Sequence, residues 1–290
     1  MNRVLVLGAY GMLGSSLCRR LVDDGYTVLR QGRGINAELT IDPTDGDEVA
    51  DLIKRHPVDA IVNLIAATNV DHCEDDPQGA YRANVLVVEA LTQAIRGYGS
   101  LSPHLIHIST DQVYDGLGPH VEGRIAPCNV YALSKLAGEL TASKVGSTVL
   151  RTNFFGHSQC AGRASLSDWI VSSLRAGQQI TVFDDVLFSA LHIDTLCTAI
   201  ELAVRTGHIG KFNVGCRNGY SKARLAFGLA ERLGLDCELM TIGRAQDMKL
   251  RARRPLDMRM DTTQFERTFC FAAPTFESQI DLAAQEYSHE

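Results

Sequence analysis

A glycine-rich turn directly after the first apolar segment constrains the fold of this chain more than any other feature. Residues 4–7 read Val-Leu-Val-Leu, and glycines follow at positions 8, 11 and 14, ahead of an amphipathic segment over 15–24. Glycines at this spacing let the backbone turn tightly and approach a pyrophosphate, whose charge is favoured at a helix N-terminus. Strand, turn and helix together predict a dinucleotide site. The residues expected to contact the dinucleotide are Gly8, Tyr10, Gly11, Met12, Leu13 and Gly14.

Strand-like and helical segments alternate through the first half of the chain. The expected elements are strands at 26–29, 40–42, 60–65, 105–108 and 147–151, and helices at 45–56, 77–97 and around 131–135. Strands that alternate with helices of this length build a parallel sheet with helices on both faces. The chain is therefore predicted to adopt an α/β fold, a Rossmann-like doubly wound parallel sheet with a smaller C-terminal substrate-binding lobe.

The alternation becomes less regular after Arg151. The elements expected there are a helix near 167–176, strands at 180–183 and 190–194, a helix at 195–205, a strand at 211–214, a helix at 222–233, a strand at 237–242 and a helix from 275. We expect an NAD(P)-binding Rossmann-like domain over 1–155, to which 179–216 return. A substrate-binding lobe is expected over 156–178 and 217–290.

A tyrosine and a lysine four residues apart follow the strand expected at 105–108. On a helix, Tyr131 and Lys135 lie on one face, about one turn apart. A neighbouring cation lowers the pKa of a tyrosine by stabilising the phenolate, and Lys135 is placed to be that cation. A hydroxyl at the strand end, on Thr110 or Ser109, would hydrogen-bond a carbonyl oxygen. We predict that Thr110, Tyr131 and Lys135 polarise a ketone for hydride attack.

The segment after the second strand distinguishes between dinucleotides. In an NAD enzyme, an acidic residue at this position binds the adenine ribose hydroxyls. Here residues 30–34 read Arg-Gln-Gly-Arg-Gly, and no carboxylate occurs before Glu38. Arg33 is expected to accommodate a ribose 2′-phosphate, which favours NADPH and leaves NADH as the second choice. The alternative is that these arginines only cover a surface loop.

Composition and residue spacing disfavour several kinds of partner. The 28 basic and 34 acidic residues give a net charge of −6, so neither nucleic acid nor an anionic membrane is expected as a partner. The cysteines and histidines lack ligand spacing, which argues against a metal site, and His192 and Asp194 are expected to pack or hydrogen-bond at a strand end. The chain begins at once with a strand and has no membrane-length apolar segment. We expect a cytoplasmic protein, as a monomer, a homodimer or a larger assembly.

Five motifs spread over nearly the whole chain form a recognisable set. They are Gly8-x-x-Gly11-x-x-Gly14, Ser109-Thr110-Asp111-x-Val113-Tyr114, Asn129-x-Tyr131-x-x-x-Lys135 with Ala137-Gly138-Glu139 behind it, Arg151-Thr152, and Arg254-Pro255. Together they resemble the extended short-chain dehydrogenase/reductases, most closely the dTDP-4-dehydrorhamnose reductase group. The resemblance implies a Rossmann-like domain that binds NAD(P)H and a lobe that binds a nucleotide-linked sugar. It also implies reduction of a 4-keto-6-deoxy sugar.

The same resemblance implies roles for individual positions. Thr110 would hold the keto oxygen, Tyr131 would donate the proton, and Lys135 would bind the nicotinamide ribose while tuning Tyr131. Asp42 would lie by the adenine. Apart from the resemblance, Arg254 precedes a proline in a basic cluster over 251–259 and is expected to bind the substrate diphosphate, with an exposed loop as the alternative. The further cofactor contacts implied are Asn63, Ala66 and Ala67. The substrate contacts implied are Thr68, Val70, Asp111, Asn153, Phe154 and Arg254.

Gln112 helps to separate reduction from dehydration. Related 4,6-dehydratases resemble this chain through a Thr-Asp-Glu run whose two carboxyl groups serve as acid and base. An amide has no proton to exchange near neutral pH, so Gln112 in the glutamate position disfavours elimination. Epimerisation followed by reduction is an alternative, but such relatives place a cysteine where this chain has Asp111. A catalytically silent NAD(P)-binding regulatory subunit is the other alternative, because a fold does not fix an activity.

Overall fold

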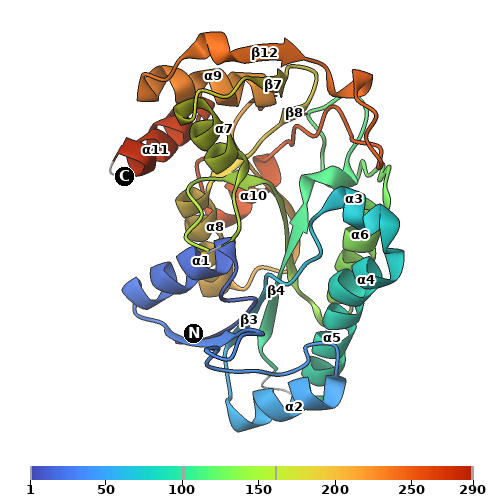
Figure 1. Cartoon of the computed structure of the whole chain (residues 1–290). Helices are drawn as coiled ribbons and strands as arrows, with labels where there is room; N and C mark the ends of the chain where they lie inside the picture. The colour runs from blue at the N-terminus through green and yellow to red at the C-terminus, as the bar shows by residue number, and fades with distance from the viewer. Residues whose placement is uncertain (1, 100–101, 161, 289–290) are drawn as a thin grey trace. The chain divides into compact units, whose positions relative to one another are not determined.

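The structure is a computed structural model, which describes residues 2–99, 102–160 and 162–288 (Figure 1). The chain divides into two compact units. The first comprises Met1–Thr110, Asn129–Arg151 and Cys197–Phe212, and the second comprises Asp111–Cys128, Thr152–Leu196 and Asn213–Glu290. Residues 111–128, 152–155, 179–196 and 213–216 thus group with the second unit, whereas the sequence placed them in the first. The assignment of cofactor and substrate to separate domains stays a prediction.

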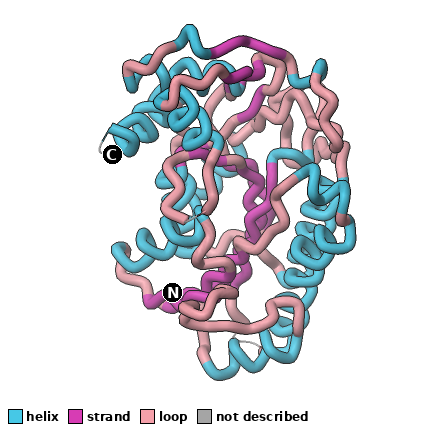
Figure 2. The backbone as a smooth tube through the Cα atoms, viewed as in Figure 1, coloured by secondary structure: helices cyan, strands magenta, loops and turns pink. Residues whose placement is uncertain are grey.

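A six-stranded sheet forms the centre of the first unit. Its strand order is β10-β5-β4-β3-β1-β2, and β1 pairs in parallel with both β2 and β3, as β3 does with β4. The strands are β1 (Arg3–Leu7), β2 (Thr27–Gln31), β3 (Ala60–Asn63), β4 (His104–Thr110), β5 (Thr148–Thr152) and β10 (Gly210–Val214). This sheet confirms the predicted α/β fold. Figure 2 shows its strands with helices on both sides.

Helices cover both faces of the sheet (Figure 1). They are α1 (Met12–Asp23), α2 (Gly46–Arg55), α5 (Val87–Gly97), α6 (Val130–Ala142) and α8 (Ile193–Thr206). Side chains of α2 and α5, among them Leu52, Val88 and Leu91, pack with Leu5 and Leu105 of the sheet in one buried cluster. On the other face α1 lies along α8, where Arg20 donates a hydrogen bond to Thr198 at 3.2 Å.

The third strand expected at 40–42 does not form, so that prediction is wrong. Only an isolated bridge joins Gln31 to Leu39. The Asp42 carboxylate instead accepts hydrogen bonds from the backbone N–H and the hydroxyl of Thr44, at 2.9 and 2.6 Å. Such a side-chain bond stabilises a turn, and Pro43 has no N–H to donate to a neighbouring strand.

The single helix expected at 77–97 is interrupted. It consists of α4 (Pro77–Tyr81), a π-helical turn over Arg82–Leu86, and α5. The π-turn carries Asn84, whose side chain is fully buried and bonds to neighbouring segments described below. Wide turns of this kind are often found at functional sites.

The second unit contains short strand pairs and helices. The strand pairs are β6 (Phe154–Phe155) with β9 (Leu191–His192), β8 (Leu187–Phe188) with β11 (Tyr220–Ser221), and β7 (Ile180–Phe183) with β12 (Met240–Gly243). The helices are α7 (Leu166–Arg175), α9 (Lys222–Leu233), α10 (Thr263–Phe269) and α11 (Phe276–Ser288). Ile170, Val182, Ala226 and Met240 pack together between α7, α9 and the β7–β12 pair.

Two strand predictions in this unit were too long. The strand expected at 190–194 is only Leu191–His192, because α8 begins at Ile193. The strand expected at 237–242 begins only at Met240, after a 3-10 turn over Cys237–Leu239. In that turn the Asp236 carboxylate accepts a hydrogen bond from the Glu238 N–H at 2.8 Å, which stabilises the turn against an extended strand.

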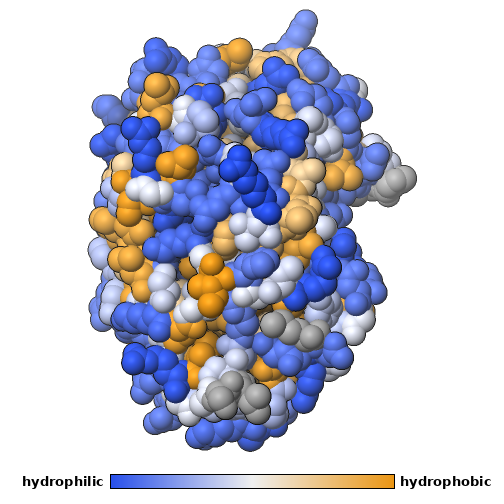
Figure 3. Space-filling model, turned by 180° about the vertical axis from the view of Figure 1, so that it is seen from behind, coloured by the Kyte–Doolittle hydropathy of each residue, from blue (hydrophilic) through white to orange (hydrophobic). Residues whose placement is uncertain are grey.

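Hydrophilic side chains cover most of the face shown in Figure 3, and hydrophobic residues are interspersed in small groups. None of the helices in the described part of the chain combines the length and the hydropathy needed to cross a membrane.

Candidate active site

The glycine turn between β1 and α1 has the geometry of a phosphate-binding turn. Gly8 has φ +77°, in the region that favours glycine, and a Cβ on Gly14 would overlap the carbonyl oxygen of Gly8. No side chain caps the N-terminus of α1, and its first turn contains no acidic residue. The N–H groups of this turn are therefore suited to an anion, and a pyrophosphate fits here.

Tyr10 and two arginines lie near this turn but in different settings. The Tyr10 hydroxyl accepts a hydrogen bond from the Glu38 N–H at 2.9 Å, and its ring lies against Gly32. Arg30 is half-buried and lines a hollow of about 330 Å³ together with Ala9, Tyr10, Ser15, Cys18 and Arg19. Its Nε is buried and makes no hydrogen bond to any described residue. Arg33, the arginine expected to hold a 2′-phosphate, is exposed on the following loop.

Three other predicted cofactor residues are engaged within the first unit. Asp42 accepts hydrogen bonds from Thr44 and forms an ion pair with Arg82 at 2.8 Å. The hydrogen bonds from Thr44 are the main cause of the lowered pKa of Asp42. Asn63 is fully buried, where its Oδ1 accepts from the Ile65 N–H at 3.1 Å. The Ala67 N–H donates to Asn84 Oδ1 at 2.9 Å. The other predicted cofactor contacts differ in burial: Leu13 is buried, whereas Met12 and Ala66 are half-buried.

Helix α6 places Tyr131 and Lys135 next to the end of β4. The Asn129 side chain caps this helix by accepting from the Ala132 N–H at 2.8 Å. Lys135 is only 2% exposed, and its Nζ donates to the Ile108 carbonyl of β4 at 2.7 Å. Tyr131 is 7% exposed, and Thr110 at the end of β4 is 4% exposed. The structure therefore places Tyr131 and Lys135 one helical turn apart against the strand that ends in Thr110.

Burial changes the protonation of Lys135. Desolvation lowers the pKa of Lys135 from 10.5 to about 8, and the charge of Glu139 partly opposes that change. His107, fully buried on β4, has its pKa held well below its ordinary value by burial and then by the charge of Lys135. Because the pKa of Lys135 is about 8, a small change in the charge of its neighbours changes the fraction of Lys135 that is protonated near neutral pH.

Asn84 connects the segment after β3 with α6. Its Nδ2 donates to the Ala67 carbonyl at 3.2 Å and to Ser134 Oγ at 2.8 Å. Ser134 precedes Lys135 and donates to the Tyr131 carbonyl at 2.8 Å. The π-turn therefore fixes the 66–68 segment against the helix that carries Tyr131. Sequence reasoning missed Asn84, because nothing in the local pattern shows that the helix widens there.

The predicted substrate residues lie in both units. In the first unit Thr68 is exposed and Val70 is buried at the start of α3 (Val70–Asp75). In the second unit Asn153 Nδ2 donates to the fully buried Asp111 carboxylate at 2.8 Å. Phe154 is half-buried in β6. Arg254, also half-buried, lines a hollow of about 250 Å³.

Lys222 is a second cation in the electrostatic environment of Asp111 and Arg254, and sequence reasoning missed it. Burial is the main cause that lowers the pKa of Lys222, while the charge of Asp111 raises it and that of Arg254 lowers it. Residues 186 and 187 bond to both segments through the backbone: the Lys222 N–H donates to the Val186 carbonyl, and the Leu187 N–H donates to the Leu256 carbonyl. Lys222 is the first residue of α9, where a helix dipole disfavours a cation. That placement was a usable sequence signal.

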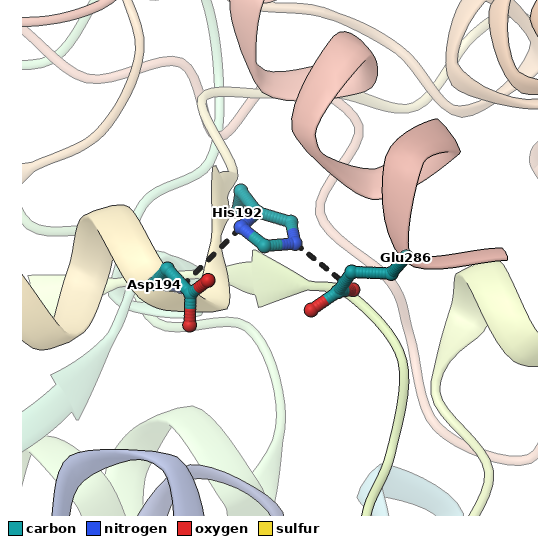
Figure 4. A group of neighbouring side chains, drawn as sticks. All are labelled: His192, Asp194 and Glu286. Atoms are coloured by element: carbon teal, nitrogen blue, oxygen red, sulfur yellow. Dashed lines mark hydrogen bonds and ion pairs between the residues drawn. The ribbon is translucent and has the colours of Figure 1, made fainter. Parts of the chain in front are cut away.

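His192, Asp194 and Glu286 meet at the end of β9 (Figure 4). The His192 Nε2 lies 3.0 Å from Glu286 Oε2, and the Asp194 N–H donates to His192 Nδ1 at 3.4 Å. Burial alone would raise the pKa of Glu286, but hydrogen bonds from His192 and from the His157 N–H lower it. The expected hydrogen bonding at this strand end is confirmed: His192 is buried there, and the exposed Asp194 joins it through its backbone N–H. One ligand atom of each residue lies within 4.8 Å of the others, a geometry that could hold a metal ion and that sequence spacing did not indicate.

Known proteins resemble the chain over its full length. It is 29% identical over 295 residues to a probable low-salt glycan biosynthesis reductase of Haloferax volcanii, with 97% of this chain and 96% of that protein covered. It is 27% identical over 290 residues to the dTDP-4-dehydrorhamnose reductase of Escherichia coli K12, with 94% of each covered.

Solved structures share the fold. The dTDP-4-dehydrorhamnose reductase of Bacillus anthracis in complex with NADP superposes with a TM-score of 0.85 at 21% identity, covering 99% of this chain and 100% of that one. The family described as RmlD substrate binding domain matches residues 1–289. This match spans the glycine turn, the Tyr131–Lys135 helix and the segment of Arg254, and the chain belongs to that family.

Proposed function

We propose that the chain is an NADPH-dependent reductase that converts the 4-keto group of a nucleotide-linked 6-deoxy sugar into a hydroxyl. The observation that carries the proposal is Lys135, a nearly fully buried ammonium one helical turn from Tyr131 and bonded to the strand that ends in Thr110. A buried lysine is costly and is retained where chemistry needs it. Relatives along the whole chain are named as reductases, two of them for a dTDP-linked sugar.

The glycine turn and Arg30 are the groups that we assign to the cofactor. Gly8, Gly11 and Gly14, with the uncapped N-terminus of α1, would hold the pyrophosphate, and Arg30 would hold a ribose 2′-phosphate. When bound, NADPH supplies the hydride that reduces the ketone carbon. Lys135 would bind the nicotinamide ribose.

Three side chains would act on the ketone. Thr110 would donate a hydrogen bond to the keto oxygen, and Tyr131 would give its proton to the alkoxide as it forms. Protonated Lys135 would lower the pKa of Tyr131 so that the phenol transfers its proton near neutral pH. The low exposure of all three side chains would keep bulk water from competing for these hydrogen bonds.

For the substrate, we assign the anionic diphosphate to Arg254 and Lys222, and the sugar to Asp111, Asn153 and Phe154. The two cations repel each other and are partly desolvated, so an anion between them would relieve both costs. Asp111 is an acceptor for sugar hydroxyls, and the Phe154 ring offers apolar contact.

The proposed function is tested by following NADPH absorbance while the protein is offered nucleotide-linked 4-keto-6-deoxy hexoses. Rapid NADPH oxidation with one member establishes the reductase and identifies its sugar. The alternative of a catalytically silent dinucleotide-binding subunit is favoured instead if NADPH binds tightly and no member of the panel causes its oxidation.

Arg30, more than Arg33, is expected to distinguish NADPH from NADH. Replacing Arg30 with alanine should raise the Kd for NADPH about tenfold, because one charge-assisted contact to the phosphate is lost. The Kd for NADH should stay nearly constant. The matched control is Arg33→Ala, which removes an exposed arginine three residues away. Fluorescence titration of both variants with both cofactors decides the assignment. If Arg33→Ala weakens NADPH binding and Arg30→Ala does not, Arg33 is the residue that binds the 2′-phosphate.

Lys222 is expected to contribute to binding of the substrate's diphosphate. Lys222→Met should raise the Kd of a nucleoside diphosphate about tenfold and leave the Kd of NADPH unchanged. Lys144→Met, which removes an exposed lysine, is the control. Isothermal titration with dTDP and with UDP measures the effect, and equal affinities in all three proteins would exclude Lys222 from the site.

A further inference from the structure

Glu139 is a buried carboxylate behind the Tyr131–Lys135 pair. It is 0% exposed and lies two turns after Tyr131 on the same face of α6. Ser109 Oγ donates to Glu139 Oε1 at 2.6 Å, Arg151 Nε donates to the same oxygen at 2.9 Å, and Arg151 Nη2 donates to Oε2 at 2.6 Å. Arg151 is 1% exposed on β5. Three bonds therefore connect α6 to β4 and β5.

Stability alone is a weak reason for such a group. Removing two charges from water costs several kcal/mol each, and replacing a buried ion pair by well-packed apolar side chains is often neutral or stabilising. The geometry here is bidentate and fully bonded, which fixes positions strongly. Ser109 directly precedes Thr110, so the bond from Ser109 to Glu139 holds the end of β4 against the helix that carries Tyr131.

Glu139 also lies one turn after Lys135. Its negative charge is the influence that raises the Lys135 pKa against burial. Ionisable groups on the elements next to α6 include His107 on β4, Arg151 on β5 and Glu74 on α3. The low pKa of His107 keeps that residue neutral, and Arg151 is paired with Glu139. Glu74 accepts a hydrogen bond from the Val130 N–H at the N-terminal end of α6.

We propose that Glu139 is a positioning residue of the reductase: it fixes Thr110 relative to Tyr131 through Ser109, and its charge keeps Lys135 protonated. This inference rests on the proposed function for its effect on turnover. Its effect on the protonation of Lys135 is independent of that function.

The first test is the pKa of Lys135 in the protein without cofactor. The chain contains six lysines, so an NMR titration of protein carrying ε-¹³C-labelled lysine resolves them, and Lys135→Met identifies the signal. In Glu139→Gln the titration of Lys135 should move to lower pH by about one unit, because the carboxylate charge is lost. In Glu139→Asp, which keeps the charge, it should move by much less.

The second test separates charge from geometry during turnover. Glu139→Gln should shift the alkaline fall of kcat/KM to lower pH, in parallel with the NMR titration. Ser109→Ala keeps the charge of Glu139 but removes its bond to β4, so it should lower kcat several-fold and leave the pH of that fall unchanged. An identical pH profile in wild type and Glu139→Gln would overturn the electrostatic role.

Glu139→Gln leaves Arg151 buried without its partner, which can prevent folding. The double variant Glu139→Gln/Arg151→Met removes both charges and avoids that cost. It should still move the Lys135 titration to lower pH, but by less than Glu139→Gln, because the cation that repels Lys135 is lost together with the carboxylate. An unshifted titration in every one of these variants that folds would refute the proposal. If wild type turns over no keto sugar but the titration shifts as expected, the proposed function fails while the electrostatic role of Glu139 stands.

Discussion

Tyr131→Phe is expected to lower kcat about 10³-fold while the Kd for NADPH stays within about twofold. The substitution removes only the hydroxyl that would protonate the alkoxide, and the ring continues to fill its position on α6. Stopped-flow or steady-state NADPH oxidation gives kcat, and fluorescence titration gives Kd.

The control for this result is Tyr26→Phe in the same unit. The Tyr26 hydroxyl donates a part-buried hydrogen bond to Glu201 at 2.9 Å, so the control loses a tyrosine hydroxyl and this bond, at a cost of about 1 kcal/mol in stability. Its kcat should remain that of wild type. Near-normal turnover in Tyr131→Phe would remove Tyr131 from the mechanism.

Lys135→Met is expected to abolish turnover, weaken NADPH binding and, at pH 7, raise the free energy of unfolding. Folding lowers the pKa of Lys135 from 10.5 to about 8, which corresponds to a cost of about 3 kcal/mol for burying the charged form. Methionine removes that cost and loses the hydrogen bond to Ile108, worth about 1 kcal/mol. The net gain should be about 2 kcal/mol by urea unfolding.

The pH dependence of this gain has a definite sign. Because the folded-state pKa lies below the unfolded one, the cost is fully present below about pH 8 and disappears as pH rises toward 10.5. Wild type should therefore gain stability relative to Lys135→Met across that window. Lys54→Met, at an exposed position of α2, should change neither stability nor activity. A Lys135→Met protein that binds NADPH normally would make Lys135 a structural residue only.

Sequence reasoning succeeded where the determinants are local. The apolar strand before Gly8, the spacing of Tyr131 and Lys135, and the helix at 222–233 each depend on a short stretch of chain, and the structure forms each of these elements. The expected strand at 40–42 failed for a local reason too, since the turn bonds of Asp42 compete with strand pairing.

The remaining features depend on contacts between distant segments. The chain places Arg30 at a hollow and Arg33 on the surface, a difference that the Arg-Gln-Gly-Arg sequence does not encode. Glu139 meets Ser109 and Arg151 from positions 30 and 12 residues away. Which partners a buried charge finds is decided by packing, because periodicity only says which side chains face inward.

The π-turn at Arg82–Leu86 has a consequence for how this chain tolerates changes in length. Each residue advances an α-helix by about 100°. Deleting one residue from the wide turn would restore a regular helix but rotate the part before it against α5. The Asn84 side chain would then lose its hydrogen bonds to Ala67 and to Ser134 at the same time. Insertions and deletions in this helix are therefore expected to be selected against. Members of this family should keep the number of residues in the helix more strictly than the identity of those residues.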